Sequence, residues 1–236
     1  MSGVYAPINK LNNNKTIIII GRGHGGTRAI AKLLRVNGVF MGEPRNIADD
    51  LMFPPHLWEA SKEYHRENKV TDRGLILLRE FLQSVINSKS EFKGWKRPIT
   101  MLIFPLLCEI LPNAKYIWWT RHINESISQG QSTDDLFDLL GYHTTKQESW
   151  NYMNSIVANS NKPPNFLHVK FEDFLLDNSN CISKISKFTG IDLKPIIIDS
   201  SKAYYGNYYV KDTSGYVDRN NTETLRLLKY MGYENA

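Results

Sequence analysis

The stretch TIIIIGRGHGGTRAIAKLL, residues 16–34, decides the expected fold of this chain. Its four consecutive isoleucines predict a short strand over about residues 16–21, because an unbroken β-branched run suits a parallel strand that is covered on both faces. Residues 27–36 have the apolar spacing of a helix, which Asn37 and Gly38 end. Strand, glycine-rich loop and helix therefore follow one another, as they do in loops that bind phosphate groups.

The rest of the sequence continues this alternation of helices and strands. Strands are expected at residues 114–120 and 166–171, and helices near residues 56–68, 73–88, 98–112, 146–161, 180–190 and 220–233. The order predicts an α/β fold, a P-loop-like three-layer α/β/α domain with a mostly parallel central sheet. Since no linker or repeat divides the chain, we expect a flexible N-terminal segment over residues 1–15 and a single domain over residues 16–236.

Composition favours an anionic ligand. The formal charge is +5 and the pI is near 9.0, but the basic residues are scattered, so a nucleic acid is not demanded. The two cysteines, Cys108 and Cys181, lie far apart and form no metal-binding spacing. The N-terminus has no apolar run of signal-peptide length, and no run approaches the roughly 18 residues needed to span a bilayer. We therefore expect a cytoplasmic protein that does not bind a membrane.

The loop itself explains how an anion is held. Glycines at positions 21, 23, 25 and 26 allow a tight turn that presents backbone N–H groups to one point, and the following helix adds a partial positive charge at its N-terminus. Thr27 is expected to cap that helix and to offer its hydroxyl to the same anion. Thr27 stands where the Walker A pattern of ATP-binding loops requires lysine. The strand in YIWWTRH is followed by Arg121 and not by an aspartate that would hold Mg²⁺, so the loop departs from the Walker A type in both respects.

The loop resembles the 5′-phosphosulfate-binding loop of the PAPS-dependent sulfotransferase superfamily, particularly its heparan sulfate and protein-tyrosine branch. Gly21, Gly25, Gly26, Thr27 and Arg28 match the family pattern, and a histidine takes the place of the usual lysine or arginine. The resemblance implies that the loop binds the sulfuryl donor 3′-phosphoadenosine 5′-phosphosulfate (PAPS) without a metal. The implied binding residues are Arg22, Gly23, His24, Gly25, Gly26, Thr27 and Arg28.

Three further segments are similar to family elements and occur in the family's order. In KYIWWTRHINESISQG, Arg121 and Ser128 resemble the arginine and serine that hold the 3′-phosphate of PAPS, with one residue of the intervening turn absent and Ser126 as a less favoured substitute. The segment GWKRP resembles a strand that ends in Lys-x-Pro, and LHVKFEDFLLD resembles the family's Val-x-Tyr-Glu-Asp-Leu segment. Together with the loop, these segments cover roughly residues 16–190.

Sulfuryl transfer requires charge stabilisation on the bridging oxygen and a base for the acceptor proton. The resemblance implies that His24 and Lys96 face the departing oxygen and that Glu43 is the base. Asp49, Asp50 and His56 remain rivals for the base. The acidic pair Glu172 and Asp173 is interpreted as structural, because a helix N-terminus favours acidic residues.

Two other functions compete with this interpretation. A P-loop phosphotransferase, such as a small-molecule kinase, shares the strand, loop and helix. A non-enzymatic nucleic-acid-binding module fits the pI, but the sequence has no basic and aromatic cluster that supports it. For a sulfotransferase, the expected partner is a small-molecule, carbohydrate or peptide acceptor, with no nucleic acid; the loops carry no recognisable code for the acceptor or for the oligomeric state.

Overall fold

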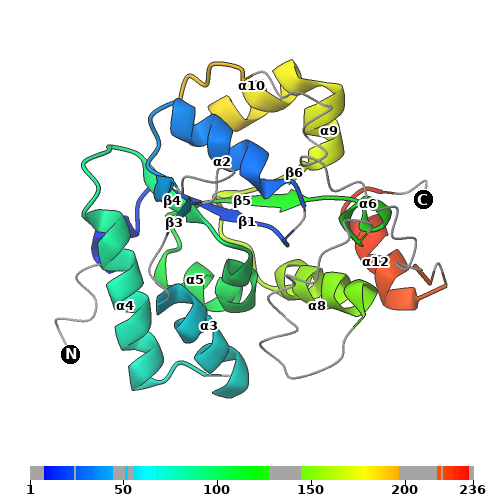
Figure 1. Cartoon of the computed structure of the whole chain (residues 1–236), viewed down its shortest axis with the longest axis horizontal. Helices are drawn as coiled ribbons and strands as arrows, with labels where there is room; N and C mark the ends of the chain where they lie inside the picture. Colours follow the sequence, from blue (N-terminus) through cyan, green and yellow to red (C-terminus); the bar gives the residue numbers. More distant parts are fainter. Residues whose placement is uncertain are drawn as a thin grey trace.

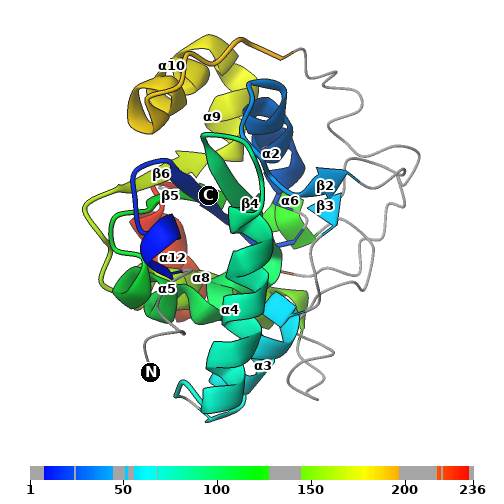
Figure 2. The ribbon, with the colours of Figure 1, turned by 90° about the vertical axis from the view of Figure 1, so that its left-hand side faces the viewer.

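A central parallel sheet with helices on both faces forms the protein in the computed structural model (Figure 1). The structure describes residues 8–23, 25–44, 51–52, 56–67, 69–127, 145–196, 217–218 and 220–233. Seen from the side in Figure 2, the three layers are separate, with the sheet in the middle. The predicted three-layer α/β/α fold is confirmed.

The sheet has the strand order β4 (Lys93–Lys96), β1 (Thr16–Ile20), β5 (Lys115–Thr120) and β6 (Phe166–Lys170), with every pair parallel. In the register, Ile18 lies between Trp95 and Tyr116. Every residue of β1 is buried, which is why its sequence is a continuous apolar run and does not alternate with polar residues. A separate antiparallel pair, β2 (Glu43–Pro44) and β3 (Leu51–Met52), follows α2 (Thr27–Val36) in the chain.

One face of the sheet is covered by α2 (Thr27–Val36), α9 (Phe171–Leu176) and α10 (Asn178–Thr189), which lie above the sheet in Figure 1. Ile17, Ile19 and Trp119 point into this layer and belong to one hydrophobic core with apolar residues of the three helices. The helix α2 has the bounds predicted from the sequence, and Gly38, with φ of +86°, follows its end.

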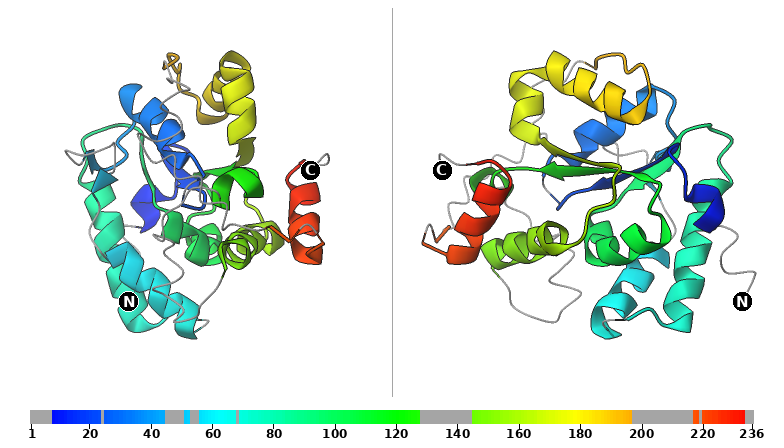
Figure 3. Two further views of the ribbon diagram at one scale, coloured as in Figure 1. Left: turned by 45° about the vertical axis from the view of Figure 1, so that its right-hand side comes forward. Right: turned by 180° about the vertical axis from the view of Figure 1, so that it is seen from behind.

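The other face is covered by a larger helical layer, which contains α3 (His56–Glu67), α4 (Asp72–Ile86), α5 (Phe104–Ile110), α8 (Lys146–Asn159) and α12 (Thr222–Tyr230). Ile18, Ile20 and Trp118 point into this layer. Successive side chains of each central strand therefore pack into the two hydrophobic cores on opposite faces of the sheet. Figure 3 shows α12 beside α8 at the end of the layer that α4 does not reach. Ile8 and Leu11, within the segment expected to be flexible, are buried in this core. The domain boundary at residue 15 stays a prediction.

The segment 98–112, expected as one helix, is divided. Residues Pro98–Ile103 form the 3₁₀ helix η1, and α5 begins at Phe104. Pro105 in the first turn of α5 has no N–H to donate to a preceding turn, so a new helix begins there more readily than the old one continues. The short helix α6 (Ile123–Ile127), which follows β5, was not predicted from the sequence.

Candidate functional site

The glycine loop between β1 and α2 is shaped by positions where only glycine fits. A Cβ on Gly21 would lie 2.6 Å from both the Trp119 carbonyl oxygen and the Thr27 Cγ2. Gly26 has φ of +75°, and its Cβ would lie 2.9 Å from the nearest Phe171 ring carbons. The indole N–H of Trp119 donates to the carbonyl of Gly25 at 3.0 Å. The loop is therefore packed tightly against β5 and the start of α9.

The N-terminus of α2 opens directly from this loop. The expectation that Thr27 caps the helix is wrong, because the N-cap residue is Gly26 and Thr27 is the first helical residue. Glycine has no side chain that could accept from the first-turn N–H groups, so these groups and the helix dipole can act on an anion in the loop. Thr27 itself is 4% exposed and lies against Gly21.

Three cationic side chains are buried where neighbouring strands end. Lys96 is the last residue of β4, Arg22 follows β1, and Arg121 follows β5; they are 8%, 5% and 4% exposed. Since β4, β1 and β5 are adjacent and parallel, their carboxyl ends meet at one edge of the sheet. Three positive charges that converge beside a helix N-terminus attract an anion. This edge is therefore suited to a strongly anionic ligand.

Arg22 links the loop to the helices α8 and α6. Its Nε donates to the hydroxyl of Ser149 on α8 at 3.3 Å, and its Nη1 donates to the hydroxyl of Ser126 on α6 at 3.2 Å. Ser126, the less favoured candidate of the sequence analysis, therefore lies beside the loop. Ser149 was not foreseen, because no pattern around it in the sequence marks it as a loop contact.

Arg121 is held on two sides. The centre of its guanidinium lies 5.1 Å from the ring centre of Phe171, the first residue of α9. Its Nη2 donates to Glu125 Oε2, one helical turn later, at 3.3 Å. A planar guanidinium held in this way can present paired donors to a phosphate.

Glu172 has specific partners that sequence analysis did not foresee. Its two carboxylate oxygens accept hydrogen bonds from the backbone N–H of His122 and from the hydroxyl of Tyr233, each at 2.9 Å. Burial lowers the pKa of His122, against the opposing effects of Glu172 and Glu125. Burial and the Glu172 charge raise the pKa of Tyr233. The carboxylate thus does more than complement a helix dipole.

Several predicted site residues lie outside the described residues. These are His24, Ser128, Asp49 and Asp50, and for Glu43 only the backbone, in β2, is described. Among the rivals for the base, His56 is described: its Nε2 lies 3.2 Å from Glu80 Oε2 on α4. The catalytic and binding roles of all these candidate residues stay predictions.

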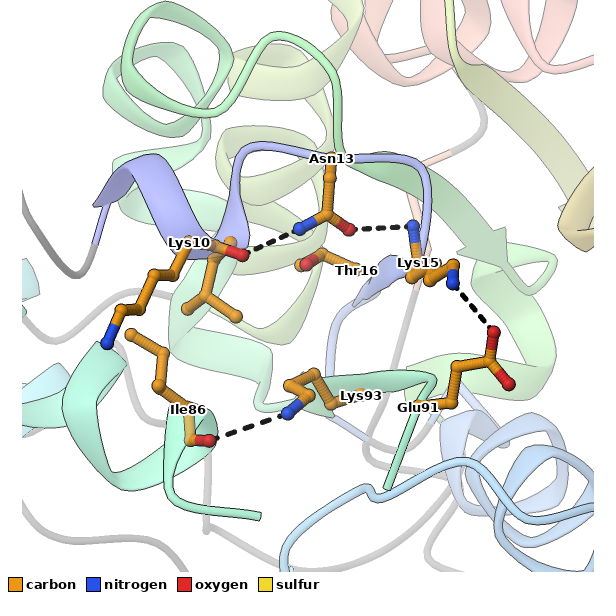
Figure 4. A pocket seen from close by; sticks show the side chains of 8 residues that line it. Lys10, Asn13, Lys15, Thr16, Ile86, Glu91 and Lys93 are labelled. Carbon is orange, nitrogen blue, oxygen red and sulfur yellow. Dashed lines mark hydrogen bonds and ion pairs between the residues drawn. The ribbon is translucent and has the colours of Figure 1, made fainter. Parts of the chain in front are cut away.

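A pocket of about 270 Å³ lies at the opposite edge of the sheet, where β1 and β4 begin (Figure 4). Two of its lysines have partners within the chain: Lys15 is paired with Glu91 at 2.7 Å, and Lys93 donates to the carbonyl of Ile86 at 3.4 Å (Figure 4). Lys93 also donates to the carbonyl of Ser88 at 2.8 Å. The Lys15 side chain is 52% exposed, whereas the three cations at the carboxyl edge are at most 8% exposed, so the two edges differ in how far their charges are buried.

Within the part of the chain that the structure describes, no helix is both long and apolar enough to cross a membrane. The same residues contain no group of three or more His, Cys, Asp or Glu side chains placed to hold a metal ion.

Comparisons with known proteins identify the family of the chain. A family model described as the sulfotransferase family matches residues 17–195, which includes the glycine loop and the strands β4, β5 and β6. The chain belongs to the sulfotransferase family. It is therefore an enzyme that transfers a sulfuryl group. No curated protein matches the sequence significantly.

Solved structures with similar folds include other members of the family. The sulfotransferase domain from the curacin biosynthetic pathway is similar with a TM-score of 0.57 at 16% identity, covering 92% of this chain and 97% of that domain. The sulfotransferase domain of the Synechococcus PCC 7002 olefin synthase has a TM-score of 0.48 at 16% identity, with 94% and 96% coverage. Mouse sulfotransferase SULT7A1, solved with PAP, has a TM-score of 0.44 at 14% identity, with 86% and 68% coverage. The first similarity supports the fold of this sulfotransferase. The sequence identities are too low to assign a substrate to it from any of these proteins.

Proposed function

We propose that this sulfotransferase moves a sulfuryl group from PAPS to a hydroxyl or amine of an acceptor and releases adenosine 3′,5′-bisphosphate (PAP). The observation that carries the proposal is the group of buried cations Arg22, Lys96 and Arg121, which follow three adjacent strands beside a helix N-terminus. PAPS bears phosphate groups at two ends of its ribose, and this edge offers positive charge from several strands. The charges of these three side chains therefore fit the two phosphate groups of PAPS.

The two phosphate positions are assigned to different elements. Loop N–H groups, the Thr27 hydroxyl and Arg28 hold the 5′-phosphate, since they surround the N-terminus of α2. Arg121 holds the 3′-phosphate through its planar guanidinium, together with Ser128 as predicted from the sequence. Ser126 is the alternative serine, and its hydrogen bond to Arg22 supports a place beside the loop.

The reaction breaks the bond between sulfur and the bridging oxygen of the 5′-phosphate and forms a bond between sulfur and the acceptor. His24 and Lys96 stabilise the negative charge that grows on the departing oxygen. The acceptor loses its proton to Glu43, with Asp49, Asp50 and His56 as alternatives. In this proposal the transfer needs no metal.

We further propose a cytoplasmic enzyme whose acceptor is a small molecule, a carbohydrate or a peptide, without nucleic acid or membrane as a partner. The resemblance of the loop to the heparan sulfate and protein-tyrosine branch supports a carbohydrate or peptide hydroxyl. A transfer assay with PAPS and pooled acceptors, in which products are detected by their gain in mass, tests the reaction directly.

The cofactor assignment is tested by Arg121→Ala. A charge-assisted hydrogen bond is worth about 1.5–3 kcal/mol, so PAP should bind roughly tenfold to hundredfold more weakly, while adenosine 5′-phosphate, which lacks the 3′-phosphate, should bind almost unchanged. Calorimetry with both nucleotides measures the difference. Arg226→Ala is the control, because that arginine lies exposed on α12 and is paired with Glu223. Equal losses for both nucleotides would remove Arg121 from the 3′-phosphate site.

A further inference from the structure

The peptide group that joins Arg121 to His122 is held at both of its polar atoms. The N–H of His122 donates to Glu172 Oε1 at 2.9 Å, and the carbonyl of Arg121 accepts from the indole N–H of Trp150 at 3.3 Å. Trp150 is 1% exposed, so its indole is fixed in the core. Because a peptide group is planar, holding its two ends fixes the orientation of the backbone from which the Arg121 side chain leaves.

The Glu172 carboxylate is itself held in place by a chain of hydrogen bonds. The Tyr233 hydroxyl donates to Glu172 Oε2 at 2.9 Å and lies 3.2 Å from the Thr120 hydroxyl, which lies 2.9 Å from His168 Nε2. When a neutral His168 carries its proton on Nε2, each group donates to the next and the chain ends at the carboxylate. The strands β5 and β6 and the C-terminal turn thus converge on one side chain.

Tyr233 is anchored beyond its hydroxyl. Its backbone N–H donates to the carbonyl of Leu228 in α12 at 2.9 Å, and the neighbouring Gly232 carbonyl accepts from Lys170 Nζ at 3.2 Å. The ring of Tyr233 lies edge-on to the ring of His122, with centres 5.3 Å apart. The C-terminal turn therefore contacts the residue that follows Arg121 directly.

We propose that Glu172, held by Tyr233, is a positioning residue that aims Arg121 at the 3′-phosphate of the donor. The start of α9 contributes twice: Phe171 packs against the Arg121 guanidinium, and Glu172 fixes the backbone of the next residue. The aim of a rigid, planar donor depends on both contacts, since a small rotation of its backbone displaces both of its N–H donors. This inference rests on the proposed function, which assigns Arg121 to that phosphate.

The test separates the reach of the side chain from its charge. Glu172→Asp keeps the charge but withdraws the carboxylate by one methylene, whereas Glu172→Gln keeps the reach and an oxygen acceptor. We expect Glu172→Asp to weaken PAP binding about tenfold and adenosine 5′-phosphate binding less than twofold, and Glu172→Gln to stay close to the wild type for both nucleotides. Asp173→Asn is the matched control, because that carboxylate is half exposed and contacts Lys170 at 3.6 Å.

A second readout keeps the inference separate from the cofactor assignment. Amide hydrogen exchange at His122, measured without nucleotide, should be slow in the wild type and faster in Glu172→Asp and Tyr233→Phe, but unchanged in the control Tyr230→Phe, whose residue is 50% exposed. Faster exchange in Glu172→Asp with undiminished discrimination between the two nucleotides would overturn the positioning role, as would unchanged exchange. A wild type that binds PAP no better than adenosine 5′-phosphate would instead overturn the cofactor assignment.

Discussion

At the scale of single residues, His168 shows how burial makes a side chain dependent on pH. Its ring packs against Trp118, with centres 4.6 Å apart, and its Nε2 faces the Thr120 hydroxyl. Burial, reinforced by Lys184 and Lys170 and opposed by Asp173, lowers the pKa of His168 to about 4. The native protein therefore keeps this imidazole neutral at pH values where an unfolded chain would protonate it.

This difference predicts a loss of stability in acid. Between an unfolded pKa of about 6.5 and the native pKa of about 4, the unfolded chain binds a proton that the native protein does not, so stability falls as the pH falls through this window. The limit for one proton is about 1.4 kcal/mol per pH unit, or up to about 3 kcal/mol over the window. Urea unfolding at pH 4.5 and 7.5 measures the loss, which should be smaller in His168→Gln. An identical loss in the variant would contradict the assignment to His168.

At the scale of elements, the cap of α8 connects helix stability to the site. The Thr145 hydroxyl accepts from the Glu148 N–H at 3.2 Å, and the Glu148 carboxylate accepts from the Thr145 N–H at 2.6 Å, which forms a capping box. The backbone hydrogen bond from Thr145, and after it the Thr145 side chain, lower the pKa of the Glu148 carboxyl. The first turn of this helix holds Ser149, whose hydroxyl accepts from Arg22, and Trp150, whose indole N–H donates to the Arg121 carbonyl.

Thr145→Ala should therefore destabilise the protein by about 1 kcal/mol, because it leaves first-turn N–H groups without an acceptor. For a chain of this size, the loss corresponds to a decrease of about 2–4 °C in Tm. Ser155→Ala, at a half-buried position on the same helix whose hydroxyl bonds the carbonyl of Tyr152, is the control and should change Tm little. Scanning calorimetry of both variants checks the prediction, which a Tm equal to that of the wild type would refute.

At the scale of the whole molecule, the site joins parts that are separate in the sequence. The cations come from three strands, and the groups that hold Arg22 and Arg121 come from both helical layers. An unfolded chain cannot present this arrangement, so a ligand of the site binds the folded protein and shifts the equilibrium toward it.

PAP should accordingly stabilise the protein in the presence of EDTA. At about 100 times its dissociation constant, the ligand adds roughly 2.7 kcal/mol to the free energy of unfolding. A thermal-shift titration with PAP, beside one with Mg²⁺ and ATP, measures the effect. Stabilisation by Mg²⁺ and ATP alone would favour a phosphotransferase over the proposed use of PAPS.

The sequence by itself determined the features that depend on neighbouring residues. The strand β1, the glycine loop and the helix α2 lie within residues 16–36, and β-branched residues, glycines and helical spacing act over such short distances. Arg121 could be found in the same way, because it follows the apolar run YIWW, whereas Lys96 was a candidate only through the resemblance of GWKRP to a family segment. The division of residues 98–112 was missed, since apolar spacing alone does not show where Pro105 starts a new helix.

Only the tertiary structure decided which distant residues meet at the site. Arg22 contacts Ser149 and Ser126 across 127 and 104 residues, and Tyr233 contacts Glu172 across 61. These contacts follow from the strand order β4, β1, β5, β6, which brings three strand ends and the C-terminal turn to one edge of the sheet. Local periodicity specifies a strand but not its neighbours, because pairing is settled by which apolar faces pack together when the whole core forms.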